Sequence, residues 1–467
     1  MTIRIFRHYW QLPLMVVAVV EFLIFFGASI AGIWYAGDLP LLTVLTTEKF
    51  VYRESLLYAS IFAVSSTAVG LYHARQRASV TGLLTRIIFA VLAAMAVIGG
   101  LAAALPQIKM TLSQLAQTGF LACCASIAVR FVFEKLVADE LFKRRVLVYG
   151  AGQRAASISQ LRRRSDRRGF NVVGYVPTEA DRPDESIAAV CASVNTELLA
   201  HCRENLVDEI VVAMDDRRRA FPMYQLLECR LDGVEVTELV TFLERETGKV
   251  RLDVLNPSWF IFSDGFRRGR VHSIFERVFD VGVSFALLLL AMPIMLLAVL
   301  AIKIEDGPKA SIFYRQIRVG RYGKNFGVLK FRSMREDAEH AGKAIWATKN
   351  DSRVTRVGSF MRVTRIDELP QIINVLRGEM SFVGPRPERP EFVSQLSERI
   401  PYYRERHTLK PGITGWAQLC YPYGSSEQDA IEKLQYDLFY IKNHTLLFYL
   451  AILLQTVEVV LWRKGAR

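Results

Sequence analysis

The sequence predicts a membrane protein with helical and α/β parts. We expect a bundle of four transmembrane helices, a Rossmann-like doubly wound domain, and a re-entrant membrane helix leading into a mainly helical cytoplasmic domain. Three observations predict this class. Hydrophobic residues make up 51% of the 467 residues, which excludes a disordered chain. Uncharged apolar runs long enough to cross a membrane occur in two separate regions. Alternating strand and helix patterns lie between them. The expected domains are 1–138, 139–266, 267–303 and 304–467.

The net charge of +13 is distributed unevenly along the chain. Residues 1–138 carry +5, residues 139–266 carry −3, and residues 267–467 carry +11. The excess predicts an anionic partner for the last part, such as lipid headgroups or phosphates. A nucleic-acid partner is not expected, because the basic residues flank apolar segments and lack interleaved aromatic residues. The six cysteines contain no CxxC pair, which excludes a disulfide scaffold.

The first 138 residues are predicted to contain four membrane spans. Residues 87–105 form an uncharged run of 19 residues, which is long enough to cross the hydrocarbon layer. The other spans are expected at residues 9–36, 56–72 and 115–129. Basic residues gather before the first span and after the second and fourth, so the positive-inside rule places the N terminus and everything after residue 138 in the cytoplasm. Glu21, the acidic residue within a span, is expected to face the bundle interior or the interface.

The segment 139–266 is expected to be an α/β domain with a parallel sheet. A short apolar strand at 145–149 leads directly into Gly150, Gly152 and Ala155, which match GxGxxA at the start of a helix. This is the setting that a dinucleotide fingerprint requires. The fingerprint also requires an acid at the end of the next strand, to bind the ribose. Here that strand runs into proline, and only Glu179 lies nearby. A Rossmann-like domain that binds no dinucleotide, or a regulatory nucleotide, therefore stays open.

A second apolar region is expected to enter the membrane without crossing it. Residues 281–302 are uncharged and long enough to span, but Pro293 lies within the run and is expected to break or kink a helix. Basic residues such as Arg277 and Lys303 flank both ends, so the charge asymmetry of a spanning helix is absent. We expect a re-entrant segment, with an ordinary fifth span as the alternative. Residues 445–462 are expected to form an amphipathic helix on the membrane surface.

The candidate site centres on the adjacent acids Asp367 and Glu368. One interpretation is that Asp367 caps the following helix while Glu368 complements its dipole. The density of fixed cations favours a phosphate site instead, because Arg362, Arg365 and Arg386 are close in sequence and guanidinium groups pair with phosphate oxygens. An acid beside phosphate can hold Mg²⁺ or attack phosphorus as a nucleophile.

Two other kinds of segment add to this candidate site. Lys330 and Arg332 follow an apolar strand-like run and supply two more cations. Residues 384–387 (GPRP) form a rigid turn that holds Arg386 in place, because proline fixes φ. Residues 411–418 (PGITGWAQ) form a second loop rich in glycine and proline.

Six motifs occur in a fixed order: RVFD, QIRVG, KFRSM, DELPQ, SFVGPRP and PGITGWAQ. On these motifs the chain resembles the bacterial sugar transferases that are monotopic polyprenyl-phosphate phosphoglycosyltransferases. The preceding bundle and α/β domain resemble the large subfamily, which includes undecaprenyl-phosphate glucose phosphotransferases of exopolysaccharide assembly. The resemblance covers the whole chain and is most specific over residues 272–467. One departure is Met292-Pro293, where the family often has Ser-Pro, so a hydroxyl that could satisfy a freed carbonyl is absent.

The resemblance implies transfer of a sugar-1-phosphate from a UDP-sugar to polyprenyl (undecaprenyl) phosphate, as the first step of exopolysaccharide or O-antigen-type glycan assembly. Asp367 would attack the β-phosphate, release UMP and form an aspartyl-phosphosugar, while Glu368 would bind Mg²⁺. The expected substrate-binding residues are Lys330, Arg332, Arg362, Arg365, Arg386, Gln316 and Arg318. The implied location is the bacterial inner membrane, in contact with its lipids, with both termini and the catalytic domain in the cytoplasm.

Two other classes of protein are alternatives to a phosphoglycosyltransferase. A membrane-anchored nucleotide-sugar dehydratase would need a YxxxK motif and a second GxGxxG, and the sequence has neither. A non-catalytic membrane scaffold or nucleotide sensor of polysaccharide export is disfavoured by the presence of both Asp367 and Glu368. The sequence does not identify the sugar or the polysaccharide, and it leaves open whether the chain forms a homodimer.

Overall fold

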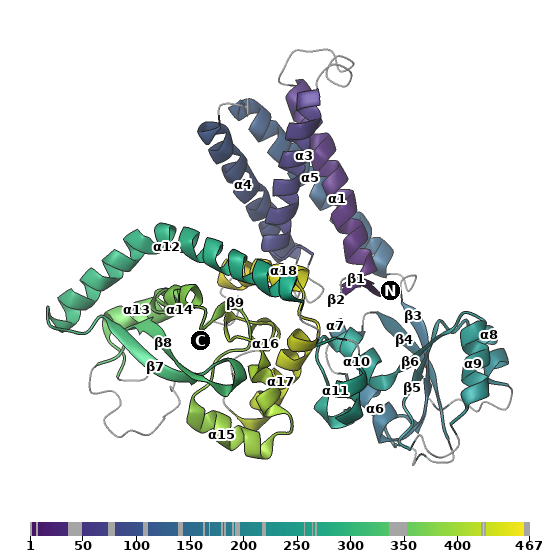
Figure 1. Cartoon of the computed structure of the whole chain (residues 1–467). Helices are drawn as coiled ribbons and strands as arrows, with labels where there is room; N and C mark the ends of the chain where they lie inside the picture. The colour runs from purple at the N-terminus through teal and green to yellow at the C-terminus, as the bar shows by residue number, and fades with distance from the viewer. Residues whose placement is uncertain are drawn as a thin grey trace. The chain divides into compact units, whose positions relative to one another are not determined.

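The structure is a computed structural model of the 467-residue chain (Figure 1). It describes residues 2–5, 8–35, 49–72, 80–105, 111–138, 143–161, 164–167, 169–178, 181, 184–188, 191, 197–216, 221–255, 257–263, 265–266, 269–335, 353–421, 424 and 426–461. The chain divides into two compact units, Met1–Gly248 and Lys249–Arg467, and each is described by itself.

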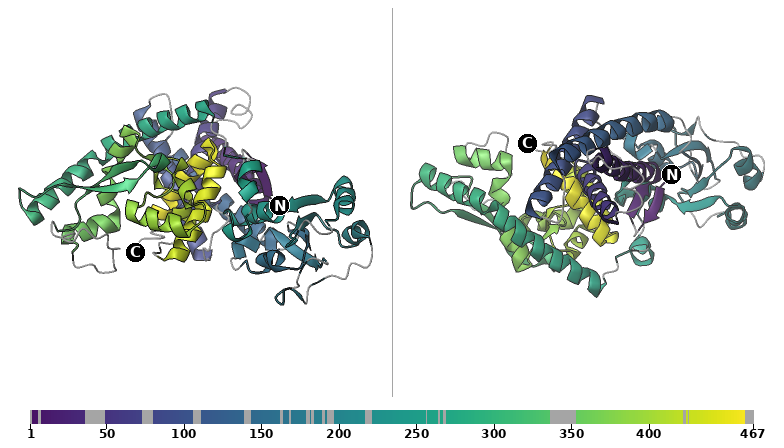
Figure 2. Two further views of the ribbon diagram at one scale, coloured as in Figure 1. Left: turned by 60° about the horizontal axis from the view of Figure 1, so that its bottom comes forward. Right: turned by 90° about the horizontal axis from the view of Figure 1, so that it is seen from above.

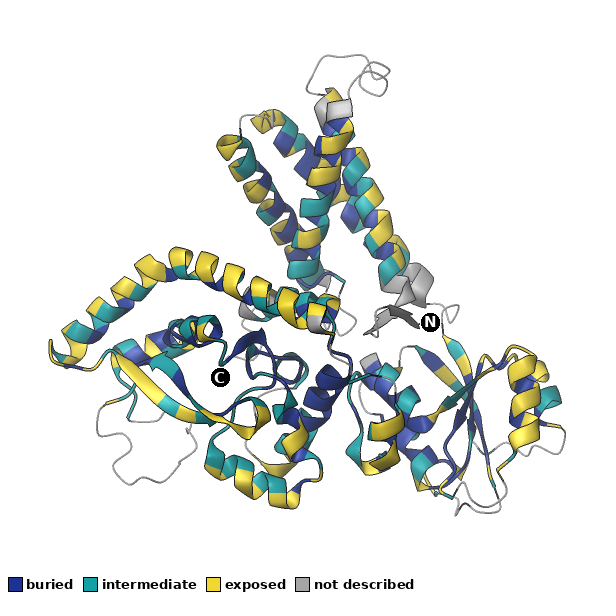
Figure 3. Ribbon diagram, viewed as in Figure 1, coloured by how far each residue is buried: buried dark blue, intermediate teal, exposed yellow. Residues whose placement is uncertain are grey.

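The first unit begins with a short antiparallel ribbon and four long helices. These elements are β1 (Thr2–Ile5), β2 (His8–Gln11), α1 (Leu12–Tyr35), α3 (Lys49–Ala68), α4 (Val80–Ala104) and α5 (Leu112–Ala138). Helix α1 contacts α3 and α5, and α4 contacts the same two helices, so the four helices form a bundle. Figure 3 shows exposed residues along the outer faces of these helices. Apolar side chains on the outside of a bundle are expected where lipid, and not water, is the surrounding solvent.

One carboxylate lies inside this bundle. Glu21 is fully buried in α1, and Arg130 of α5 approaches its carboxylate to 2.8 Å. The hydroxyl of Tyr72 donates a second hydrogen bond of 2.5 Å to the same carboxylate. Glu21 therefore faces the bundle interior, as its position within an apolar run predicts.

Four helices of the described chain are long and apolar enough to cross a membrane. They contain Met15–Gly32 (α1), Gly82–Ala104 (α4), Leu112–Phe133 (α5) and Val271–Asp306 (α12, Arg270–Asp306). Helix α3 holds the second predicted span but is not among them, because Arg53 and Glu54 lower its hydropathy. The length and composition of these helices make the chain a membrane protein.

The rest of the first unit is an α/β fold around a parallel sheet. Its elements are β3 (Arg144–Tyr149), α6 (Gln153–Ser159), α7 (Arg164–Arg167), β4 (Phe170–Val176), α8 (Leu198–Glu204), β5 (Glu209–Val212), α9 (Met223–Leu231), β6 (Glu235–Glu238) and α10 (Leu239–Thr247). The four strands are all parallel, in the order β4-β3-β5-β6. Leu147 and Ile210 of the two central strands are fully buried against Cys202 and Cys229 of α8 and α9. The β-branched and apolar strand sequences explain this core.

The second unit mixes helices with two pairs of short strands. The elements of its first part are η3 (Leu252–Val254), α11 (Pro257–Phe262), α12, β7 (Phe313–Val319), η4 (Arg321–Gly323), β8 (Asn325–Phe331), α13 (Arg356–Thr364), η5 (Ile366–Glu368) and α14 (Gln371–Arg377). The remaining elements are β9 (Ser381–Val383), α15 (Pro390–Arg399), η6 (Tyr403–Thr408), β10 (Gly412–Thr414), α16 (Trp416–Cys420), α17 (Glu427–Lys442) and α18 (Leu446–Leu461). Strands β7 and β8 form an antiparallel hairpin, and β9 pairs with β10 in parallel.

Helix α12 runs along one face of the second unit, over α13 and α14 (Figures 1 and 2). It is one continuous helix of 37 residues that includes Pro293, and Figure 1 shows it as an arch. The expected helix break at Pro293 is therefore wrong: the proline deletes one backbone hydrogen bond, but the packing of Ala298 and Ile302 stabilises the helix beyond it. Ala298 and Ile302 on its inner face pack against Phe331 and Met361, whereas most of its large apolar side chains are exposed.

Both ends of α12 are bonded to neighbouring helices of the same unit. Near its start, Arg277 donates to the carbonyl oxygens of Val375 and Leu376 at 2.6 and 2.5 Å, in the last turn of α14. Near its end, the carboxylate of Glu305 accepts hydrogen bonds of 2.7 and 2.9 Å from the first two amides of α13. These contacts satisfy backbone groups that helix ends leave without intrahelical partners.

Candidate active site

The two adjacent acids lie in a single turn between two helices. Helix α13 ends at Thr364, and Arg365 then takes a left-handed conformation with φ of 61°. A residue other than glycine seldom adopts this conformation, and such residues cluster at functional sites. The chain then forms the 3₁₀ turn η5, which holds Asp367 and Glu368. Helix α14 begins only at Gln371, so the interpretation of Asp367 as its N-cap is wrong.

Glu368 lies among three cations. Its Oε1 is 3.1 Å from Nζ of Lys330 and 3.7 Å from a guanidinium nitrogen of each of Arg365 and Arg386. Burial opposes ionisation of Glu368, but the charges of Lys330 and the two arginines outweigh it and lower its pKa to about 2. Glu368 is therefore a carboxylate at any physiological pH.

The pKa of Asp367 is shifted in the opposite direction. Its side chain is buried, and burial together with the charge of Glu368 raises its pKa, against the opposing charges of Lys330 and Arg362. Among the described residues, no hydrogen-bond donor reaches its buried Oδ1. A poorly solvated carboxylate oxygen of this kind is fit to attack an electrophile or to bind a cation.

A pocket opens beside Glu368, and the neighbouring Asp367 is not among the residues that line it. It is lined by Arg318, Val328, Lys330, Glu368, Gln371, Arg386, Pro387, Gly412 and Ile413, and its volume is about 300 Å³ including space open to solvent. Strands β7 and β8 supply Arg318 and Lys330. The pocket thus brings three cations and one carboxylate together from segments that are well separated in the sequence. Such a set of charges suits an anionic ligand with phosphate oxygens.

The loops after β9 and before β10 meet through glycine. A Cβ atom on Gly412 would lie 2.1 Å from the amide nitrogen of Gly384, so neither loop tolerates a side chain there. The amide of Gly412 donates to the carbonyl of Pro385 at 3.0 Å. The carbonyl of Arg386 accepts a hydrogen bond of 3.1 Å from Arg406, which is paired with the buried Asp437 at 2.8 Å. These contacts fix the backbone that carries Arg386.

The remaining predicted substrate-binding residues lie in different places. Gln316 accepts a hydrogen bond of 3.0 Å from Arg318 and so orients a residue of the pocket. Arg362 lies in α13, and its charge acts on Asp367. Arg332 does not line the pocket: it is buried and bonded to Asp306 and Ser311 at 3.2 and 3.1 Å.

Sequence reasoning missed two kinds of residue. Gln371 of the DELPQ motif lines the pocket, and its place in that motif was an available signal. Arg406 and Asp437 support the loop of Arg386, but they lie outside the motifs, and no local pattern marks them.

The glycine turn of the first unit presents a separate candidate. Gly150 and Gly152 follow β3, and Ala155 is buried in α6. The amides of Gln153 and Arg154, at the start of α6, donate to the carboxylate of Asp215 at 3.1 and 2.9 Å. An internal carboxylate thus takes the amides that a bound phosphate would use. Glu179 lies outside the described residues.

Comparisons with known proteins give the family. A model described as bacterial sugar transferase matches residues 271–463, and one described as CoA-binding domain matches residues 67–227. The UDP-glucose:undecaprenyl-phosphate glucose-1-phosphate transferases of Klebsiella pneumoniae and Escherichia coli K12 are 35% and 33% identical to this chain, over 68% of it and 67% of each relative. The UDP-N-acetylgalactosamine-undecaprenyl-phosphate N-acetylgalactosaminephosphotransferase of Aeromonas hydrophila is 37% identical over 52% of this chain and 56% of its own length.

The matches thus cover about half to two thirds of these relatives. The family model spans every described residue of the pocket. The chain belongs to the bacterial sugar transferase family.

Proposed function

We propose that the chain is a phosphoglycosyltransferase, which moves a sugar-1-phosphate from a UDP-sugar to undecaprenyl phosphate. The observation that carries this proposal is the pair of adjacent acids with pKa values shifted in opposite directions, one of them lining a pocket with three cations. The names of the relatives, which describe transfer of glucose-1-phosphate or N-acetylgalactosamine phosphate, support the reaction class.

The reaction has two displacement steps at one phosphorus atom. A carboxylate oxygen of Asp367 attacks the β-phosphorus, the bond from that phosphorus to the bridging oxygen breaks, and UMP leaves with the electron pair. A phosphate oxygen of undecaprenyl phosphate then attacks the same phosphorus and breaks its bond to Asp367. This step regenerates the carboxylate and yields undecaprenyl-diphosphosugar. A carboxylate nucleophile divides one difficult phosphoryl transfer into two easier ones.

The cations stabilise the charge that develops on phosphorus. Lys330 and Arg386 line the pocket and are already oriented by Glu368, so little reorganisation is needed when a diphosphate enters. Arg318 lies on the opposite strand of the hairpin and adds a third positive charge. Mg²⁺ would be held by Glu368, which stays ionised, and would neutralise charge on the diphosphate.

The reactivity of the Asp367 carboxylate depends on two opposing influences on its pKa, burial and the charges of nearby cations. Burial of Asp367 removes water that would otherwise solvate its carboxylate and raises its pKa, while the charges of nearby cations oppose that rise. A raised pKa strengthens the oxygen as a nucleophile, and the ionised fraction decides how often it can react.

We further propose that α12 is re-entrant, so that both of its ends lie at the cytoplasmic face of the inner membrane. A straight helix of 36 residues would be about 54 Å long, whereas the hydrocarbon layer is about 30 Å thick. Arg277 and Glu305, near the two ends, bond to α14 and α13 of one compact unit. A helix that crossed the membrane would separate these two ends by the thickness of the bilayer. Cysteine labelling of Arg270 and Lys309 variants tests this: both should react only from the cytoplasmic side, and labelling from opposite sides would contradict it.

The α/β part of the first unit has a parallel strand order that supports a doubly wound, Rossmann-like fold. We propose that its glycine turn is closed to phosphate, because the carboxylate of Asp215 already holds the two amides at the start of α6. The turn then serves the packing of the domain.

The test of the proposed reaction is UMP release by the purified full-length chain with a panel of UDP-sugars, with and without undecaprenyl phosphate. At least one donor should give UMP and a lipid-linked product. Asp367→Asn should lower the rate by about three orders of magnitude. The matched control, Glu398→Gln, removes an exposed carboxylate of α15 and should keep the wild-type rate. If no donor gives UMP, the chain is a scaffold or sensor instead. A near wild-type rate for Asp367→Asn would overturn the role of Asp367.

A further inference from the structure

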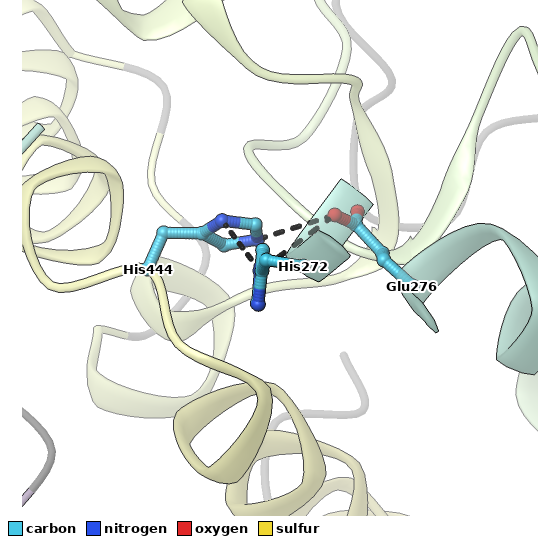
Figure 4. A group of neighbouring side chains, drawn as sticks. All are labelled: His272, Glu276 and His444. Carbon is cyan, nitrogen blue, oxygen red and sulfur yellow. Dashed lines mark hydrogen bonds and ion pairs between the residues drawn. The ribbon is translucent and has the colours of Figure 1, made fainter. Parts of the chain in front are cut away.

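Three potential metal ligands converge at the start of α12 (Figure 4). His272 and Glu276 lie one helical turn apart on α12, and His444 lies in the turn between α17 and α18. One ligand atom from each of the three residues lies within 4.8 Å of the other two. Segments 172 residues apart in the sequence therefore meet at this point.

The distances between the ligand atoms are short. Nε2 of His272 is 3.2 Å from Nδ1 of His444 and 4.0 Å from Oε2 of Glu276. The same oxygen of Glu276 is 3.7 Å from Nε2, the other ring nitrogen of His444. Zinc binds imidazole nitrogen and carboxylate oxygen at about 2.0–2.2 Å, and tetrahedral angles then separate neighbouring ligands by roughly 3.3–3.6 Å. With one ligand atom from each residue, the three atoms lie within 4.8 Å of one another, so side-chain shifts of about 1 Å would bring them to this spacing.

The surroundings hold these side chains in place. The side chain of His444 is 4% exposed, and those of His272 and Glu276 are 19% and 17% exposed. The ring of Tyr440 packs edge-on against His444 at 5.1 Å between centroids. The site is thus largely enclosed, with His272 and Glu276 partly accessible to solvent.

We propose that His272, Glu276 and His444 bind one divalent transition-metal ion of the zinc type, with water as the remaining ligand. Two imidazoles and one carboxylate form a ligand set that suits zinc and related ions and is unsuited to Mg²⁺, which prefers oxygen ligands. This site is distinct from the carboxylates of the pocket, and the proposal does not depend on the proposed reaction.

The bound ion joins the base of α12 to the start of α18. Oε1 of Glu276 also lies 3.4 Å from the hydroxyl of Ser381, the first residue of β9. Strand β9 leads into the loop that carries Arg386. Glu276 therefore links the metal site to the strand that precedes an arginine of the pocket.

The competing explanation is a pair of histidines joined by a hydrogen bond, without metal. Two neutral imidazoles can share one such bond, since each has one donor and one acceptor nitrogen. The two explanations differ in what the protein does when zinc is added, because only a metal site takes up a stoichiometric ion and is stabilised by it.

The experiment uses the full-length chain, purified in detergent and stripped with a chelator. Zn²⁺ is titrated against a chromophoric competitor, and thermal unfolding is recorded with and without the ion. Wild type should bind one ion per chain with a rise in Tm. His272→Gln and His444→Gln should each weaken binding at least about tenfold, since loss of even an outer-shell partner typically costs this much. His201→Gln, which removes a histidine of the other unit and leaves the cysteines intact, should bind as wild type does.

X-ray absorption at the zinc edge of wild type gives a measurement that needs no variant. The proposal predicts only nitrogen and oxygen neighbours at about 2.0–2.2 Å, and no sulfur at about 2.3 Å. A sulfur shell would assign the ion to cysteine and overturn the proposal. Wild type that binds no stoichiometric ion, or equal binding by wild type and both histidine variants, would also overturn it. Wild type that binds zinc but releases no UMP from any donor would contradict the proposed function and leave the metal site supported.

Discussion

Lys330 and Arg332 are neighbouring cations of one motif, and the structure predicts different consequences for their removal. Nζ of Lys330 contacts Glu368 at 3.1 Å and faces the pocket, whereas Arg332 is 7% exposed and bonded to Asp306. We expect Lys330→Met to lose a charged contact with phosphate that is worth about 1.5–3 kcal/mol, which is roughly a 10- to 150-fold fall in kcat/KM. We expect Arg332→Met to act on stability instead.

The size of the Arg332 effect follows from its surroundings. Substitution by methionine would leave Asp306, which is 25% exposed, without this cation, and would remove a hydrogen bond to Ser311. A partly solvated ion pair of this kind contributes less than the 3–5 kcal/mol of a fully buried one, so we expect a loss of about 1–3 kcal/mol. Tm should fall, while kcat/KM per folded molecule stays within about threefold of wild type.

Loss of Lys330 should not act by protonating Glu368. Three cations together hold the pKa of Glu368 at about 2, so removal of one leaves the group ionised at neutral pH. The assay is UMP release at pH 7.5 over a range of donor concentrations, with active protein counted by its folded fraction. Lys330→Arg and Arg332→Lys are the charge-retaining controls and should be milder than the methionine variants. If Arg332→Met lost as much kcat/KM per folded molecule as Lys330→Met, the assignment of the two residues would be refuted.

Three other predictions concern acid sensitivity, metal and nucleotide. Burial and the charge of Glu368 raise the pKa of Asp367, so kcat/KM should fall as decreasing pH protonates Asp367. The charge of Arg362 opposes this shift, so Arg362→Gln should move the acid limb to higher pH, and an unmoved limb would assign it to another group. Chelation with EDTA should abolish UMP release and Mg²⁺ alone should restore it, whereas turnover in EDTA would exclude the role given to Glu368. Because Asp215 occupies the amides of the glycine turn, calorimetry should detect no saturable binding of NAD⁺ or NADH to the purified chain, and micromolar binding would show that the turn opens.

The acid pair and most of its cations could be predicted from the sequence. Arg362, Arg365 and the acids lie within seven residues, so local spacing is enough to bring them together. Arg386 could be added because proline and glycine predicted a rigid turn around it. The apolar membrane helices could also be predicted, because the length of an apolar run and its lack of charge are properties of neighbouring residues.

The contacts of Arg332 could not be predicted from the alternation of side chains along the strand. Residues two apart on a strand share a face, so Lys330 and Arg332 would point the same way if the strand continued. Strand β8 ends at Phe331, and Arg332 therefore leaves the alternation and bonds to the end of α12. Strand ends depend on long-range packing and are not encoded by the strand's own residues.

Two other features depend on contacts between distant segments. Asp215 reaches the amide of Gln153 across 62 residues, so the glycine fingerprint alone could not reveal that its amides are taken. His272 and His444 come together across 172 residues, and neither has a metal-ligand spacing with the other in the sequence. Continuity of α12 through Pro293 was also not predictable, because the packing of Ala298 and Ile302 stabilises the helix beyond the proline.

The central claim is that Asp367 carries the phosphosugar between the two substrates. Its most direct test is mass spectrometry of the protein after acid quench, with the active UDP-sugar present and undecaprenyl phosphate absent. The account predicts a mass increase of one sugar phosphate on the peptide that contains Asp367, removed by addition of undecaprenyl phosphate and absent from Asp367→Asn. UMP release with no adduct, or an adduct on another residue, would contradict it.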